Sequence, residues 1–87
     1  MNWHSDLSSH AERQLKRLPS DVQARIARAI DELEADPLQG DVIPLKGRWR
    51  GRYRKRVGRY RIFFLLNHAE RRIDISAIEL RNEGTSR

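Results

Sequence analysis

The chain has no cysteine, three prolines and six aromatic residues among its 87 residues. Without cysteine there is no disulfide framework, no thiolate metal site and no thiol nucleophile. No apolar run approaches the roughly 18 residues that a transmembrane helix needs. The N-terminus also lacks the basic start and apolar run of a signal peptide. We therefore expect one soluble, cytoplasmic domain over residues 1–87 with no membrane partner.

Acidic residues are scarce in the second half of the chain. The first 44 residues carry a net charge of −3 and the remainder +9, which gives the overall +6. The segment Lys46–Arg61 holds nine basic residues and no acidic one. Basic side chains interleaved with Trp49, Tyr53 and Tyr60 are typical of a surface that binds a polyanion. Because the segment runs directly into the apolar stretch Ile62–Leu66, a disordered basic tail is the weaker interpretation.

The first part of the chain predicts two helices joined as a hairpin over about residues 5–36. Apolar residues recur at helical spacing over Leu7–Leu18 and again over Val22–Leu33. Pro19 ends the first helix, and Asp36–Pro37 ends the second, because a residue before proline is disfavoured in the helical region. Neither apolar stripe is covered by the other alone, so both helices need a third surface.

Capping residues indicate where these helices begin. Ser5 is one candidate N-cap of the first helix, and Ser9 with Glu12 forms a competing capping box. Ser20 with Gln23 forms a second capping box, which we expect to start the second helix.

The second half predicts a sheet over about residues 52–81. Alternation from Arg52, a glycine-first two-residue turn at Gly58 and Arg59, and a second alternating run from Tyr60 predict a hairpin with a type II′ turn. A third strand is expected over Arg72–Leu80. Its alternation assigns one face to three residues: Ile73, Ile75 and Ala77.

Together these elements predict an α+β fold. The N-terminal helical hairpin packs on one face of an antiparallel sheet of three or four strands, and the other face stays partly open. The segment Gly40–Gly51 is expected to be a loop or irregular edge. A short additional strand around Asn2–His4 is weakly signalled.

Strand alternation places Arg54 and Arg56 on one face, and the hairpin brings Arg61 within several ångströms of them. Lys55 alternates to the opposite face. Because the planar guanidinium fork matches phosphate oxygens, this patch predicts a phosphate site, most naturally on nucleic acid. The alternative is a solvated basic strand without a specific ligand.

No ordinary acid–base machinery accompanies the arginines. His4, His10 and His68 lack the spacing of metal ligands, and no paired carboxylates, nucleophile motif or phosphate-binding glycine loop is present. We therefore predict no metal and no cofactor. Arginines in this position would stabilise the extra charge of a phosphorane while the 2′-OH of RNA itself attacks.

The segments Leu45–Gly47 and Gly51–Phe64 resemble the central signature of the RelE/ParE superfamily of bacterial toxins. In that signature a leucine, a basic residue and a glycine precede the run glycine–x–tyrosine–arginine–x–arginine–x–glycine–x–tyrosine–arginine. The helical hairpin that ends at Leu33–Pro37 and the last strand, which ends at Arg81, fall where the family has them. The resemblance therefore covers nearly the whole chain.

The resemblance implies a type II toxin of a toxin–antitoxin pair. RelE-like members are ribosome-dependent endonucleases that cut mRNA, and we expect this activity here. ParE-like members instead poison DNA gyrase, and a degenerate toxin that only binds its antitoxin is a third alternative. In each case the partner is a small antitoxin, which we expect to be acidic and amphipathic.

The resemblance also assigns roles by position. The residues implied in catalysis are Arg54, Arg56, Arg61 and Arg81. The residues expected to hold messenger or ribosomal RNA are Lys46, Arg48, Arg50, Arg52, Lys55 and Arg59. The sequence departs from RelE-like nucleases in three ways: the tail Asn82–Arg87 has neither tyrosine nor histidine, Glu79–Leu80 stands where a glycine/histidine pair is more usual, and arginine stands where lysine is frequent. The replacement of lysine by arginine weakens proton transfer and leaves phosphate binding intact.

Overall fold

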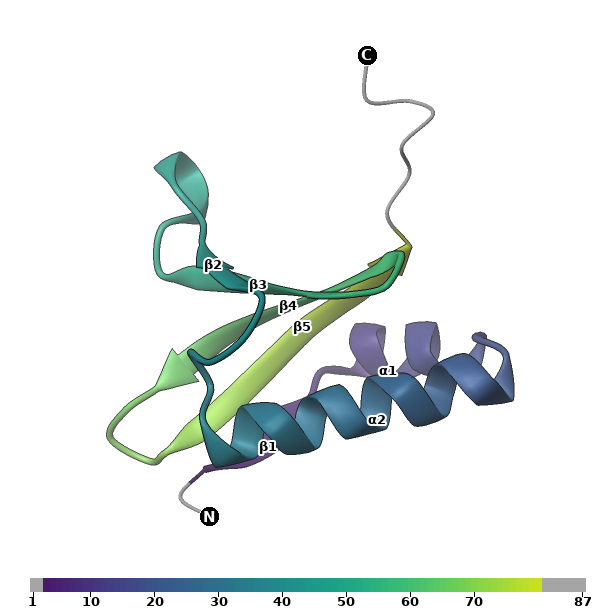
Figure 1. Cartoon of the computed structure of the whole chain (residues 1–87). Coiled ribbons are helices and arrows are strands. Elements are labelled where there is room, and N and C mark those ends of the chain that lie inside the picture. The colour runs from purple at the N-terminus through teal and green to yellow at the C-terminus, as the bar shows by residue number, and fades with distance from the viewer. Residues whose placement is uncertain (1–2, 81–87) are drawn as a thin grey trace.

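The computed structural model describes residues 3–80 and confirms the α+β fold. Both helices lie on the same face of a single sheet (Figure 1). The elements in chain order are β1 (His4–Leu7), α1 (Ser9–Lys16), α2 (Ser20–Ala35), β2 (Val42–Pro44), a short 3₁₀ turn (Gly47–Trp49), β3 (Arg52–Val57), β4 (Tyr60–Asn67) and β5 (Arg72–Leu80).

The sheet has five strands in the order β1-β5-β4-β3-β2, not three or four, and it is mixed. β1 pairs in parallel with β5, with Leu7 opposite Ile75. β2 pairs antiparallel with β3 and forms the other edge. The N-terminal strand covers His4–Leu7, whereas the sequence placed it around Asn2–His4; Asn2 lies outside the described residues. Strands this short contain too few residues to show a clear alternation. Pairing with a neighbouring strand therefore determines where they form.

Ser8 caps α1, so neither predicted cap is correct. Its hydroxyl accepts a hydrogen bond from the Ala11 N–H at 3.0 Å and donates one to the carbonyl of Ser76 at 3.1 Å. Ser5 belongs to β1 instead. Its N–H and its hydroxyl both donate to the Glu34 carboxylate, at 3.1 and 2.7 Å. Pairing with β5 keeps this stretch extended, and the helix begins later.

The second helix has its predicted bounds without its predicted capping box. Ser20 is already helical and Pro19, at the cap position, makes no side-chain cap bond. The Gln23 amide still reaches back, but it donates to the carbonyl of Leu18 at 2.9 Å. The helix ends at Ala35, before Asp36, as the following proline predicts. No helix among residues 3–80 is long and apolar enough to cross a membrane.

The core fills the space between the helices and the inner face of the sheet. It is built from two alanines and a set of large aliphatic and aromatic side chains: Ala11, Ile26, Ala29, Ile30, Leu33, Ile62, Phe64, Ile73, Ile75 and Ile78. At the far end of β3 the predicted turn is confirmed. Gly58 has a φ of +58° and Arg59 has no positive φ, as a type II′ turn requires.

A bulge in β5 reverses the predicted faces of the residues that follow it. Phe63 pairs with Ala77 while Phe64 pairs with Ile75, so Ser76 has no partner of its own across the ladder. Beyond the bulge the alternation is reversed, and Ile78 is buried in place of Ala77.

Candidate functional site

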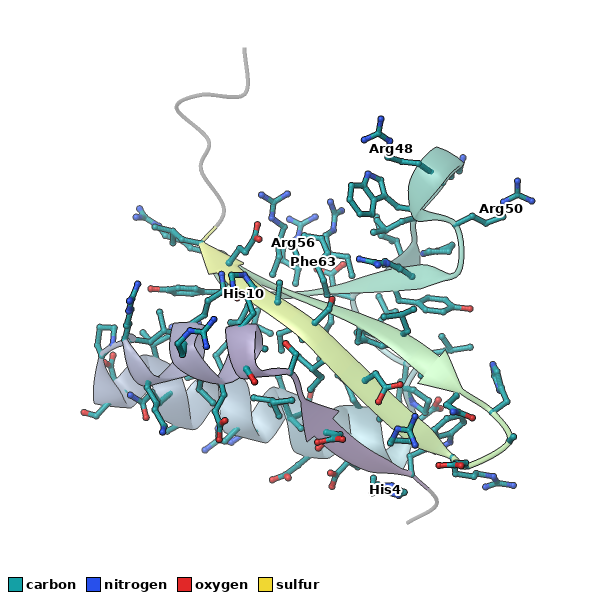
Figure 2. The ribbon with its side chains drawn as sticks, turned by 180° about the vertical axis from the view of Figure 1, so that it is seen from behind. His4, His10, Arg48, Arg50, Arg56 and Phe63 are labelled. Carbon is teal, nitrogen blue, oxygen red and sulfur yellow. The ribbon has the colours of Figure 1, made fainter. Side chains whose placement is uncertain are left out.

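The sheet face opposite the helices, called here the open face, gathers the predicted arginines. Arg52, Arg54 and Arg56 alternate onto it from β3. In the β3–β4 pairing Arg56 lies opposite Arg61, and Arg54 lies opposite Phe63. Figure 2 shows the side chains of Arg56 and Phe63 pointing away from the helices. The pairing therefore brings together the three arginines that the hairpin pattern predicted.

Most of this positive charge is not neutralised within the described residues. Arg56 forms an ion pair with Asp41 at 3.3 Å, but both side chains are about half exposed, so the pair is weak. Arg54 and Arg61 form no ion pair with any residue of the range 3–80. The Nε atom of Arg61 is buried and has no hydrogen-bond partner in that range, while its guanidinium carbon lies 5.8 Å from the centre of the Phe63 ring. Such a group of like charges favours an anionic ligand.

Arg72 shows the contrasting, structural use of an arginine in the same sheet. Its Nε donates to Asp74 at 2.7 Å, and a second ion pair joins it to Glu70. The hydrogen bond and the charge of Asp74 raise the pKa of this guanidinium above its ordinary value. Within residues 3–80 the open-face arginines have no comparable pair of carboxylates, so their charge is available to a ligand.

Lys55 lies on the opposite face of β3, and this position does not suit the RNA contact expected of it from the sequence. Its side chain is buried between the sheet and α2, where the Nζ atom lies 3.3 Å from a carboxylate oxygen of Glu32. Lys55 therefore holds α2 to β3 and does not belong to the group that could contact RNA on the open face.

The other predicted residues that the structure describes lie in the two turn regions that flank β3. Lys46, Arg48 and Arg50 are exposed around the 3₁₀ turn, and Figure 2 shows Arg48 and Arg50 projecting from it. Arg59 is exposed in the β3–β4 turn. Arg81, the fourth residue implied in catalysis, lies outside the described residues.

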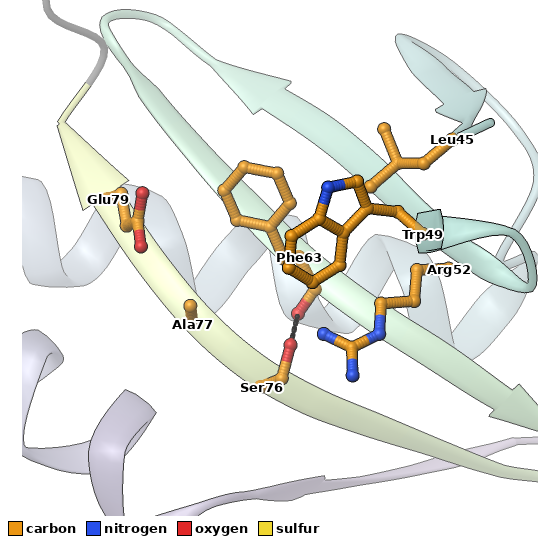
Figure 3. A pocket seen from close by; sticks show the side chains of 7 residues that line it. All are labelled: Leu45, Trp49, Arg52, Phe63, Ser76, Ala77 and Glu79. Carbon is orange, nitrogen blue, oxygen red and sulfur yellow. Dashed lines mark hydrogen bonds between the residues drawn. The ribbon is translucent and has the colours of Figure 1, made fainter. Parts of the chain in front are cut away.

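A groove of about 390 Å³ runs across the open face beside the arginines (Figure 3). The Arg52 guanidinium carbon lies 5.2 Å from the centre of the Trp49 ring. The groove is lined by residues from β3, β4, β5 and the 3₁₀-turn region: Leu45, Trp49, Arg52, Phe63, Ser76, Ala77 and Glu79.

The groove was not predicted from the sequence. Two signals for it were present: Trp49 within the basic segment, and Phe63 on the face of Arg61. Glu79 stood out only as a departure from the family pattern, and unbroken alternation from Ile73 would turn its side chain towards the helices. The bulge at Ser76 brings it onto the open face.

The three histidines lie apart from this site. His4 is in β1, His10 is in α1 and His68 follows β4, where its ring packs edge-on against Trp3 at 5.6 Å. Among the residues that the structure describes, no cluster of histidine and acidic side chains could hold a metal ion.

The fold is that of the RelE-like toxins. The chain superposes on the RelBE2 toxin–antitoxin complex of Mycobacterium tuberculosis with a TM-score of 0.86 and 22% identity, covering 93% of this chain and 100% of that one. The archaeal RelE–RelB complex of Pyrococcus horikoshii gives 0.82 and 28% identity, with 95% and 99% covered. The isolated RelE toxin of E. coli gives 0.78 and 17% identity, with 97% and 92% covered.

A protein-family model that the chain matches identifies its family. Residues 6–83 match the model of the ParE toxin of type II toxin–antitoxin systems, parDE, and the chain therefore belongs to this toxin family within the RelE/ParE superfamily. The resemblance noted from the residues is confirmed. A comparison with curated protein sequences gives no match.

Proposed function

We propose that this toxin is a RelE-like, ribosome-dependent mRNA endonuclease that acts in the cytoplasm. The observation that carries the proposal is the open-face group of Arg54, Arg56 and Arg61, which the β3–β4 pairing holds together and in which Arg54 and Arg61 form no ion pair with any residue of the range 3–80. Backbone pairing fixes their spacing, so they offer a preorganised site for one phosphate and its neighbours.

In the proposed reaction the 2′-oxygen of a messenger nucleotide attacks the adjacent phosphorus, and the bond from phosphorus to the 5′-oxygen breaks. The products are a 2′,3′-cyclic phosphate and a 5′-hydroxyl. The arginines stabilise the additional negative charge at phosphorus in the transition state. A guanidinium carries only N–H donors and has no acceptor for a further proton. The proton of the 2′-OH therefore passes to water or to the ribosome, and the leaving oxygen gains one from water.

The proposal includes an antitoxin as the neutralising partner. The M. tuberculosis and P. horikoshii relatives are toxin–antitoxin complexes. For this chain we expect an acidic, amphipathic antitoxin, because its charges would complement the open face.

The test is primer extension on a message translated in a purified system with the wild-type toxin. We expect new 5′ ends inside codons, which should appear only when ribosomes translate the message. The variant Arg61→Gln should cut about 10²-fold more slowly, as for the loss of one transition-state donor. Arg13→Gln, an exposed arginine on α1, is the matched control and should cut normally. An intact message with the wild-type toxin contradicts the proposal.

A second candidate, poisoning of DNA gyrase, is favoured by two observations. The matching family model is that of the ParE toxin. In addition, none of the histidines or the buried Lys55 of the described range reaches the open-face arginines to move a proton. Gyrase–DNA cleavage complexes that accumulate while messages stay intact would establish this function. A toxin that neither cuts messages nor traps gyrase, and that does not arrest growth, is a degenerate member that only binds its antitoxin.

A further inference from the structure

We propose that the open-face groove binds one nucleobase of single-stranded RNA and that Glu79 selects guanine there. This inference rests on the proposed nuclease function and deepens it, because it names what lies beside the scissile phosphate. It is carried by the aromatic rings that line the groove, by its position next to the arginines, and by the single carboxylate at its β5 side.

The groove offers stacking surfaces for a base. Trp49 is 48% exposed although it lines the groove, and the half-buried Phe63 lines the same groove from β4. The Arg52 guanidinium lies against the Trp49 ring and presents a further planar cation. Proteins that bind single-stranded RNA stack unpaired bases on aromatic rings and arginine planes in this way.

The groove and the arginines are placed for one nucleotide to occupy both. Phe63 lies directly opposite Arg54 on β3 and opposite Ala77 on β5. Neighbouring strands are about 5 Å apart, so a phosphate over Arg54 and a base over Phe63 are separated by roughly the width of a sugar. Ala77 presents only a methyl group, which leaves room above the sheet.

Glu79 places a negative charge in the groove, which a simple phosphate site would not have. It pairs across the sheet with Arg61, yet it forms no ion pair with any residue between 3 and 80. A carboxylate here repels phosphate, so the backbone stays over the arginines and the base turns towards β5. The Watson–Crick edge of guanine carries two adjacent donors, N1–H and the N2 amino group, which match the two oxygens of a carboxylate.

The binding test uses the fluorescence of Trp49 in the full-length chain with Trp3→Phe, so that one tryptophan reports. The probes are short oligouridines whose central base is guanine, inosine or uracil. Inosine has almost the same shape as guanine and lacks the N2 amino group, so it separates edge reading from stacking. We expect the guanine probe to quench Trp49 and to bind roughly tenfold more tightly than the inosine probe.

Two variants locate the preference. In Glu79→Gln the probes should still quench Trp49 fluorescence. Its affinities for the guanine and inosine probes should lie within about twofold of each other, because one of the two carboxylate acceptors is replaced by an amide donor. Glu12→Gln, an exposed glutamate on α1, is the matched control and should keep the full preference. Absence of Trp49 quenching by any probe, or equal binding of guanine and inosine by the wild-type groove, overturns the proposal.

Cleavage supplies an independent readout. If the toxin cuts messages, Glu79→Gln should change which codons are cut. Unchanged cleavage positions would overturn base selection by the groove and would leave the proposed nuclease function standing. Equal loss of cleavage at all positions would place Glu79 in the chemistry and also overturn base selection. If the toxin cuts no message but Trp49 quenching keeps its guanine preference, the groove is supported and the nuclease function is wrong.

Discussion

At the scale of single residues, Lys55 differs from its neighbours on β3 because its side chain is buried in an ion pair. Arg54 and Arg56 extend over the open face, whereas the Lys55 ammonium is enclosed beneath α2 with Glu32 as its ionic partner. A buried ammonium that loses its ionic partner still carries the free-energy cost of desolvation, which nothing then offsets. The pair therefore stabilises the contact between helix and sheet.

We predict that Glu32→Gln lowers the free energy of unfolding by about 1–2 kcal/mol. The value lies below that of a fully buried pair, because the Glu32 side chain is 61% exposed and partly solvated. Urea unfolding measures it, and Asp31→Asn on the same helix is the matched control. A midpoint that shifts no more than that of the control would show that water replaces Glu32 without loss.

At the scale of elements, the β5 bulge is completed by side chains from α1 and its cap. The Ile78 N–H donates to the side-chain oxygen of Gln14 at 2.7 Å, and the Ser76 carbonyl accepts from Ser8. The bulge therefore depends on α1 being docked. It decides which residues of β5 reach the core and which reach the open face.

We predict that Gln14→Ala costs about 1–2 kcal/mol of unfolding free energy, because it leaves the N–H of the buried Ile78 without an acceptor. Hydrogen exchange at the Ile78 amide should become faster. Lys16→Ala, an exposed change on the same helix, controls for helix propensity. Unchanged protection of Ile78 in Gln14→Ala would mean that the bulge is held by β4 alone.

The elements that could be predicted from the sequence are those whose pattern is local. Helical spacing, Pro19 and Pro37, and the glycine-first turn at Gly58 identified both helices and the β3–β4 hairpin. They placed Arg54, Arg56 and Arg61 on one face. The edge strands β1 and β2 have four and three residues, so they show too little alternation to be recognised. They depend on pairing with distant segments.

The groove depends on structure that no local pattern carries. Glu79 reaches the open face because Ser76 is skipped in the ladder. Trp49 lines the groove because the 3₁₀ turn folds back beside β3. The bulge needs Gln14, which is 64 residues from Ile78 in the chain. The arginine group could therefore be anticipated, whereas the residues proposed to select a base could not.

At the scale of the whole molecule, the helix layer and the centre of the sheet differ in charge. The first 44 residues, with a net charge of −3, include both helices and the edge strands β1 and β2, whereas residues 45–80, with eleven basic and three acidic residues and so a net charge of +8, include β3, β4 and β5. Figure 1 shows the helices on one side of the sheet only. A polyanion should therefore approach from the side opposite the helices, guided by the field of the open face.

This arrangement of charge predicts that the salt dependence of RNA binding arises from the open face alone. If the proposed open-face arginines Arg52, Arg54, Arg56 and Arg61 each contact one phosphate, log K for a single-stranded RNA should fall with log salt at a slope of about −3. Fluorescence anisotropy of a labelled oligouridine between about 50 and 200 mM salt measures the slope. Arg54→Gln should reduce its magnitude by about 0.7, whereas Arg13→Gln on the helix side should leave it unchanged although it removes the same charge. Equal reductions in the two variants would show that net charge, and not its placement on the sheet, governs the binding of RNA.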